Sequence, residues 1–347
     1  MYQENTAGPM DHTFDLGVFY GPKASKAATR LAGYREPSIH TPKANPNYLF
    51  QPDVLQLLIF WWTRPQKDNK GLWLWGPTGT GKSSAFEQFF ARLNVPVFQK
   101  SVNGFTRFEE FEGHFATDES GNLVFQYGVL PLAMMHGGIL LIDEADQLDP
   151  EVASGFHAVL DGRPHVLLEN GGEAITPHPN FRIVCTGNTN GSGDETGFYQ
   201  GVQIQNVAYM ARFLAKKVGY MDKELEKRVL KKVVGSSLDD DLLDRMIDYA
   251  NDVRTAFTGE STDSSQPMRR QDRVRITMEI RSLIDWALMT KQCEKVASFG
   301  IAPIKYALDA CLLDKASTGD RVKLEEWFQR KFDKGFASSE SDDKEVD

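Results

Sequence analysis

Gly76-Pro77-Thr78-Gly79-Thr80-Gly81-Lys82-Ser83 matches G-x-x-x-x-G-K-[ST], the pattern of a phosphate-binding loop. The glycines let the backbone wrap so that several N–H groups point inward at one anion. The lysine reaches the β- and γ-phosphates as a mobile positive charge, and the serine hydroxyl is a ligand for Mg²⁺. We therefore expect residues 76–84, with Ser84 as the last, to bind ATP, and Ser83 to contact Mg²⁺.

The residues on either side of this loop favour the same interpretation. Leu72–Trp75 is a short apolar run typical of a buried strand, and Ser84–Leu93 can form a helix. A strand–loop–helix unit is the setting that the pattern requires, and the positive end of the helix dipole then faces the phosphates. A glycine-rich turn that matches by accident is the alternative, and these flanks make it the weaker one.

A second chemical element is Gly138-Ile139-Leu140-Leu141-Ile142-Asp143-Glu144. Its apolar run predicts a strand buried on both faces of a parallel sheet, and the carboxyl ends of such strands are where ligands bind. We expect Asp143 to hold Mg²⁺, directly or through water, and Glu144 to polarise the attacking water. Many strands end in an acidic residue, so this pattern has weight only because a phosphate-binding loop precedes it.

Asn188 is a third candidate, because Gly187-Asn188-Thr189 ends another predicted strand, Phe181–Thr186. An amide at that place can hydrogen-bond a γ-phosphate or the attacking water. An asparagine in an ordinary turn would be the better interpretation if the two preceding elements were absent.

Composition bounds the class of protein. The chain has 347 residues, 41% of them hydrophobic, and a net charge of −9, as in a globular protein of about two domains. The acidic balance argues against a dedicated nucleic-acid binder, since no overall positive field attracts phosphates. Three distant cysteines favour a reducing compartment, and neither a signal peptide nor a membrane span is expected. We expect a cytoplasmic protein without a membrane partner.

The order of predicted elements gives an α/β fold followed by a helical part. Prolines punctuate residues 1–50, so we expect an extended amino-terminal arm there. Residues 51–221 are predicted to form an αβα core with a five-stranded parallel sheet, whose remaining strands are Pro96–Ser101 and Leu214–Val218. Residues 222–335 are predicted to form a helical lid with a flexible loop at 258–268, and the acidic residues 336–347 a disordered tail.

Helices inside these regions are predicted at residues 52–63, 128–136, 150–160 and 202–213 of the core, and at 222–234, 238–257, 275–290 and 302–313 of the lid. Asn170-Gly171-Gly172, flanked by two short apolar segments, predicts a β-hairpin at 166–176. Residues 102–126 are a mixed segment in which phenylalanines alternate with glutamates.

With these elements in order, the chain resembles the AAA+ ATPases, and among them the MoxR clade and the ATPase subunits of aerobic cobaltochelatases. The resemblance lies in residues 76–84 (GPTGTGKSS), 128–146, 280–287 (IRSLIDWA) and above all 177–213, which includes GNTNGSGDETGFYQG. It implies the core-plus-lid fold and a homo-oligomeric ring, usually a hexamer.

The same resemblance implies roles for individual residues. It implies Asn188 as sensor 1, Arg212 as an arginine finger inserted into a neighbour's site, and Arg281 as sensor 2. This family usually has proline before the sensor 2 arginine, whereas Ile280 stands here, and an arginine on the lid surface is the alternative role. The hairpin at 166–176 and the insertion at 102–126 would face the pore of the ring or a partner.

Three functions follow as hypotheses. The first is a ring ATPase that remodels or activates a protein partner, which in this family often carries a von Willebrand factor A domain. The second is the ATPase subunit of a cobaltochelatase, although the scattered histidines form no obvious cobalt site. The third is a nucleic-acid motor, against which the acidic balance and the lack of an appended DNA-binding module count.

Overall fold

The computed structural model of the chain describes residues 9–65, 70–194, 197–235, 237–259, 273–293, 297, 299–300 and 302–332. It divides into two compact units. The core unit comprises Met1–Pro77 and Gly81–Gly219, and the helical unit comprises Thr78–Thr80 and Tyr220–Asp347. Of the predicted flexible loop at 258–268, only Thr258 and Gly259 are described, and they end a helix; the predicted acidic tail at 336–347 lies outside the described residues.

Five parallel strands form the sheet of the core unit, in the order β11-β3-β10-β7-β4. Their bounds are Gly71–Trp75 (β3), Val97–Ser101 (β4), Ile139–Asp143 (β7), Arg182–Gly187 (β10) and Phe213–Lys217 (β11). This confirms the predicted α/β class with a five-stranded parallel sheet. Because all five strands run the same way, their carboxyl ends share one edge of the sheet and their amino ends the other.

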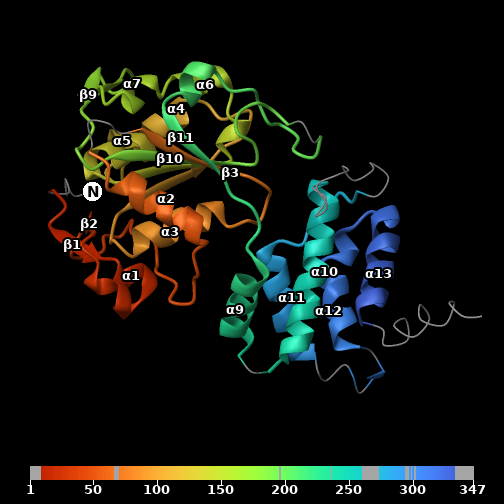
Figure 1. The fold of residues 1–347 in the computed structure, drawn as a ribbon. Coiled ribbons are helices and arrows are strands. Elements are labelled where there is room, and N and C mark those ends of the chain that lie inside the picture. The colour runs from red at the N-terminus through yellow and green to blue at the C-terminus, as the bar shows by residue number, and fades with distance from the viewer. Residues whose placement is uncertain are drawn as a thin grey trace, which may run out of the picture. The chain divides into compact units, whose positions relative to one another are not determined.

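Successive side chains of β3 point to opposite faces of the sheet, and each face is covered by helices. Leu72 and Leu74 pack into a cluster with α2 (Pro52–Trp62) and α3 (Lys82–Ala91), whereas Trp73 packs into the opposite cluster. That second cluster contains side chains of α5 (Val129–His136), α6 (Pro150–Ser154) and α7 (His157–Leu160). Figure 1 shows α2 and α3 on one side of the sheet and α6 and α7 on the other.

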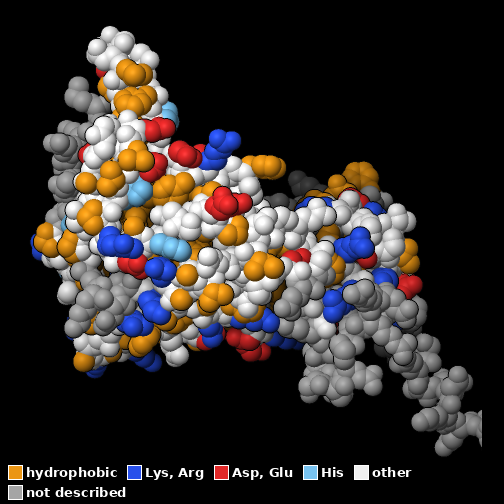
Figure 2. Space-filling model, turned by 90° about the horizontal axis from the view of Figure 1, so that it is seen from above, with side chains coloured by type: hydrophobic (Ala, Val, Ile, Leu, Met, Phe, Trp, Pro, Cys, Tyr) orange, Lys and Arg blue, Asp and Glu red, His pale blue; other side chains and the backbone are white. Residues whose placement is uncertain are grey.

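Two hairpins extend from the second face. After α4 (Glu109–Glu112), the predicted mixed segment forms β5 (Gly113–Thr117) and β6 (Leu123–Tyr127). The predicted hairpin around Asn170-Gly171-Gly172 is present as β8 (His165–Leu167) and β9 (Glu173–Ile175). Both carry exposed hydrophobic side chains: Phe115, Leu123, Val124 and Val166. Exposed hydrophobic side chains are also seen on the face of the protein shown in Figure 2.

Polar contacts tie the β8–β9 hairpin to the β5–β6 hairpin and to α4, which precedes it. Nε2 of His165 lies 2.6 Å from Oε1 of Glu112, and the Tyr127 hydroxyl donates to Oε2 of Glu173 at 2.8 Å. These bonds join residues far apart in the chain, so the two hairpins are braced against each other.

The amino-terminal segment is more regular than the extended arm that its prolines predicted. It contains the paired strands β1 (His12–Asp15) and β2 (Arg30–Gly33), with α1 (Gly17–Tyr20) and a 3-10 turn at Pro22–Lys26 between them. Leu31 is fully buried against the α2–α3 side of the core, and Nε1 of Trp62 donates to the carbonyl of Ala32 at 2.8 Å. Burial of this segment on the core provides the stabilisation that its local sequence lacks.

Three predicted helices differ in extent from those observed. The helix predicted at 150–160 is broken at Gly155-Phe156 into α6 and α7. Of 202–213 only Val207–Met210 (α8) is helical, because the Asn206 side chain accepts from the Ala208 N–H and starts the helix there. The helix predicted from residue 275 begins only at Ile280.

The helical unit consists of α9 (Lys223–Val234), α10 (Asp240–Thr258), α11 (Ile280–Gln292), α12 (Pro303–Cys311) and α13 (Thr318–Phe332). Asp222 and Asp239 cap α9 and α10 by accepting from backbone N–H groups. Inside the unit, Arg254 Nη1 donates to Glu226 Oε2 at 2.8 Å, and both side chains are almost fully buried (3% and 1% exposed).

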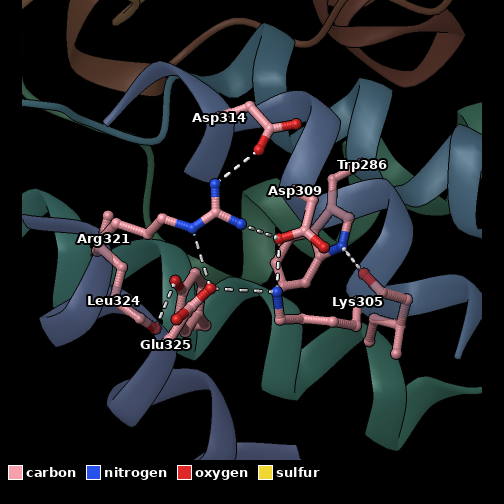
Figure 3. Close-up of polar contacts among 9 residues, drawn as sticks. Trp286, Lys305, Asp309, Asp314, Arg321, Leu324 and Glu325 are labelled. Carbon is pink, nitrogen blue, oxygen red and sulfur yellow. Dashed lines mark hydrogen bonds and ion pairs between the residues drawn. The ribbon is translucent and has the colours of Figure 1, made fainter. Parts of the chain in front are cut away.

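A network of charged side chains joins α12 to α13 at the surface of this unit. Arg321 donates to Asp314 at 2.7 Å and to Glu325 at 3.1 Å, and it approaches Asp309, which also accepts from Lys305 (Figure 3). The buried side chains of Leu324 and Phe328 hold α13, a strongly charged helix that the sequence did not predict, and the more exposed ion pairs add to that packing. None of the helices in the described part of the chain is long and apolar enough to cross a membrane.

Candidate functional site

The phosphate-binding loop runs from the end of β3 to the start of α3. Gly76, Gly79 and Gly81 have φ values of 145°, 73° and 85°, which side chains with a Cβ rarely adopt. A Cβ on Gly76 would lie 2.2 Å from the carbonyl oxygen of Val218, which is too close for any side chain. The loop is therefore a backbone cradle that only glycine permits at these positions.

Lys82 is the first residue of α3 and is buried against the loop. Its Nζ donates to the carbonyls of Gly76 and Pro77, each at 2.8 Å. The first N–H groups of α3 lack partners within the helix and face the same loop. A positive side chain and a helix amino terminus thus meet at the cradle, which is the arrangement that a triphosphate requires.

Asp143, at the carboxyl end of β7, accepts two hydroxyl groups on one oxygen. Ser83 Oγ donates to Asp143 Oδ1 at 2.6 Å, and Thr186 Oγ1 of the neighbouring strand β10 donates to the same atom. A carboxylate next to hydroxyl oxygens is a set of donors suited to Mg²⁺, which takes one or two carboxylates together with water and phosphate oxygens. The side chains present thus fit the predicted ion. Thr186 was missed, although a hydroxyl beside Gly187-Asn188 at a strand end was a usable signal.

Glu144 has an unusual backbone conformation, with φ 60° and ψ 34°. Among the described residues, Asn94 and Glu144 are the non-glycine positions with positive φ. Asparagine tolerates this region, whereas glutamate does so only at an energetic cost. The side chain is exposed, and its Oε2 accepts from Gln147 Nε2 at 2.8 Å. Conformations of this kind persist where the surrounding structure enforces them, often at functional sites.

Asn188 is held in place by a residue that sequence reasoning missed. Oδ2 of Asp146 accepts from the N–H groups of Asn188 and Thr189, each at 2.8 Å, and from the Thr189 hydroxyl at 3.1 Å. Asp146 is fully buried, and burial raises the pKa of its carboxyl group. Its Oδ1 has no hydrogen-bond partner in the described part of the chain. Asp146 thus anchors the backbone that carries Asn188 beside the ends of β7 and β10.

Arg212 lies at the other edge of the sheet. Its carbonyl accepts from the Gly71 N–H at 2.9 Å, and the next residue, Phe213, pairs with Gly71 at the start of β3. The phosphate-binding loop begins after Trp75, where β3 ends, so the length of a strand, roughly 16 Å at 3.3 Å per residue, separates the two. The structure therefore brings Lys82, Ser83, Asp143, Glu144 and Asn188 to one edge and leaves Arg212 at the other.

Arg281 belongs to the helical unit, where it is the second residue of α11. Its side chain is 82% exposed and lies 3.6 Å from the carboxylate of Glu279. Its assignment as sensor 2 remains a prediction.

Comparison with known proteins adds the following findings. Residues 71–198 match the family described as AAA domain (dynein-related subfamily). The aerobic cobaltochelatase subunit CobS of Sinorhizobium sp is 29% identical over 311 residues, which cover 87% of this chain and 86% of that protein. An uncharacterized protein of Staphylococcus haemolyticus is 30% identical over 254 residues, covering 71% of this chain and 84% of that protein.

Among solved structures, the RuvB Holliday junction branch migration motor of Thermotoga maritima is similar with a TM-score of 0.48 and 11% identity, covering 79% of this chain and 73% of that one.

Proposed function

This chain belongs to the AAA+ ATPases and is an ATP hydrolase, and from that premise we propose that it works as a ring of identical subunits that uses ATP hydrolysis to remodel or activate a protein partner. The position of Arg212 carries the proposal. An arginine finger must reach the γ-phosphate, and Arg212 lies at the sheet edge opposite its own phosphate-binding loop. A neighbouring subunit can offer its loop to this arginine, and a closed ring gives every subunit such a neighbour.

Within one site we assign the following roles. Residues 76–84 bind the phosphates, and Ser83 and Asp143 would hold Mg²⁺, which would neutralise charge on the triphosphate. Glu144 orients the attacking water and accepts its proton, for which its exposed carboxylate at the end of β7 is available. Asn188, held by Asp146, hydrogen-bonds the γ-phosphate or that water. Arg212 of the next subunit stabilises the charge that develops during transfer.

Mixing two inactive variants tests the ring. Lys82→Ala removes the main countercharge of the triphosphate, and Arg212→Ala removes the finger, so each variant alone should be inactive. In mixed rings, a Lys82→Ala subunit offers its intact finger to the intact loop of an Arg212→Ala subunit. ATPase activity should therefore reappear on mixing. If mass photometry shows mixed rings and activity stays absent, Arg212 does not act across the interface.

The partner is a protein that contacts the braced hairpins β5–β6 and β8–β9. Their exposed Phe115, Leu123 and Val166 offer apolar surface for a partner, and we propose that it carries a von Willebrand factor A domain. A second candidate role, favoured by the extent of identity with CobS, is as the ATPase subunit of a cobaltochelatase. Affinity capture with a Glu144→Gln chain in ATP distinguishes them. A captured chelatase subunit would support the second role, and capture of neither class would count against both.

A further inference from the structure

The surroundings of Arg212 form a cavity at the amino edge of the sheet. Its volume is about 670 Å³, and three other basic side chains contribute to its lining: Arg64, Lys70 and Arg182. A carboxylate, Asp161, which follows α7, also lines it. Asp161 is thus an anion on a surface that, in the proposed ring, meets a neighbour's triphosphate. A carboxylate at this place would repel the triphosphate, so its presence needs a physical explanation.

Asp161 holds the Arg212 guanidinium through two parallel hydrogen bonds. Arg212 Nε donates to Oδ1 at 2.7 Å, and Nη2 donates to Oδ2 at 3.0 Å. This fork geometry fixes the plane of the guanidinium as well as its position. Arg212 Nη1 donates in addition to the carbonyl of Ala208 at 2.6 Å. Three of the five N–H groups of the guanidinium are engaged in this way, and one on each Nη lies outside these bonds.

The pairing has a physical consequence for a finger. A free arginine side chain samples many rotamers, and the entropy lost on ordering it would otherwise oppose its contact with the transition state. Asp161 orders the side chain before the neighbour's nucleotide arrives. The hydrogen bonds from Arg212 are also the main cause that lowers the pKa of the Asp161 carboxyl group, so the pair stays ionised at neutral pH.

We infer that Asp161 is the positioning residue of the Arg212 finger: it holds the guanidinium at the amino edge of the sheet so that the outer N–H groups of Nη1 and Nη2 are presented to the neighbouring subunit's phosphates. This inference rests on the proposed function, because it requires that Arg212 act across an interface. Asp161 does not itself touch the nucleotide in this arrangement.

The test uses kinetics of the full chain. Asp161→Ala should lower kcat on the order of 10–10²-fold, the effect of a catalytic group displaced by about an ångström, while ATP affinity stays unchanged. Asp161→Asn keeps one acceptor oxygen and the shape of the side chain, so it should fall between the parent and the alanine variant. Arg163→Ala is the matched control. Arg163 donates to the same carboxylate at 3.1 Å, but its side chain is 64% exposed, and its loss should leave kcat within about twofold.

Mixing assigns the defect to the finger. Asp161→Ala mixed with Lys82→Ala should regain activity, because the Lys82→Ala subunit carries an intact finger pair. Asp161→Ala mixed with Arg212→Ala should not, because neither chain presents a positioned finger. A merely structural defect in Asp161→Ala would leave both mixtures equally weak.

The outcomes separate the two levels of the proposal. If Arg212→Ala fails to complement Lys82→Ala, the ring function itself fails. If that pair complements but Asp161→Ala has normal activity, or fails to regain activity with Lys82→Ala, the positioning role alone is overturned. A rise in kcat for Asp161→Ala would also overturn it, since it would mean that Asp161 restrains Arg212 rather than presenting it.

Discussion

Replacement of Glu144 by glutamine should separate ATP binding from ATP hydrolysis. The amide has the size and shape of the carboxylate and can still accept the 2.8 Å hydrogen bond from Gln147 Nε2. It cannot take a proton from water. Ser83 and Asp143, which hold Mg²⁺ in our assignment, hydrogen-bond each other and are untouched. ATP affinity should therefore change little, and the loss should fall on the chemical step.

The size of that loss follows from the role. Removal of a general base typically lowers the rate about 10²–10⁴-fold. At 1.36 kcal/mol for each factor of ten, this corresponds to about 2.7–5.4 kcal/mol of transition-state stabilisation. The upper half of the range is expected here, because Glu144 has a strained backbone conformation at the carboxyl end of β7, and an alternative carboxylate would have to reach the same place.

Single-turnover hydrolysis of radiolabelled ATP, with a fluorescent nucleotide for the dissociation constant, measures both quantities. Glu151→Gln is the matched control, because it makes the same chemical change at an exposed position, the second residue of α6. It should hydrolyse ATP at the parent rate. A Glu144→Gln rate within about tenfold of the parent would show that the base lies elsewhere, and a large loss of ATP affinity would show that Glu144 contributes to binding instead.

Three further outcomes are expected. Lys82→Ala should bind ATP too weakly to detect by isothermal calorimetry; tight binding would refute the phosphate-binding loop. Burial raises the pKa of Asp146, so the folded state favours the protonated carboxyl group. The contribution of Asp146 to the free energy of unfolding is therefore greatest below about pH 4 and is lost as the pH rises through the folded-state pKa. Asparagine does not ionise, so the melting temperature of Asp146→Asn minus that of the parent should increase from pH 4.5 to pH 7.5. A difference that stays constant over this range would contradict the reasoning. Arg254→Met should destabilise the chain in urea by about 3–5 kcal/mol, because it leaves Glu226 buried without its partner, and adding Glu226→Leu should recover most of the loss.

Local patterns were sufficient to predict the elements on which the site depends. An apolar run followed by Gly76 and ending at Lys82 predicts a strand, a cradle and a helix, since each of these is set by neighbouring residues. The same holds for Asp143 at the end of β7 and for the hairpin around Asn170-Gly171-Gly172.

Tertiary partners could not be predicted in that way. Asp161 pairs with Arg212 across 51 positions, and Asp146 reaches Asn188 across 42, so neither contact has a local pattern. Strand order places the end of β7 beside that of β10, whereas packing of α7 in one cluster with Tyr209 and Phe213 brings Asp161 to the start of β11. The predicted start of α8 was wrong for a related reason: capping by Asn206, rather than the spacing of apolar residues, determines where this helix begins.

The segment after β7 combines two features that oppose stability. Glu144 holds a left-handed backbone conformation, which costs about 1–2 kcal/mol for a residue with a Cβ. Asp146, two residues on, is fully buried with three hydrogen bonds on one carboxylate oxygen and none from the described residues on the other. Glycine at the first position would lower the first cost, so stability alone does not explain the glutamate there. Both unfavourable features lie where the ends of β7 and β10 flank the cradle. A catalytic carboxylate and a fixed amide are needed at that place. Strain that is retained there is an argument for function that does not depend on any sequence motif.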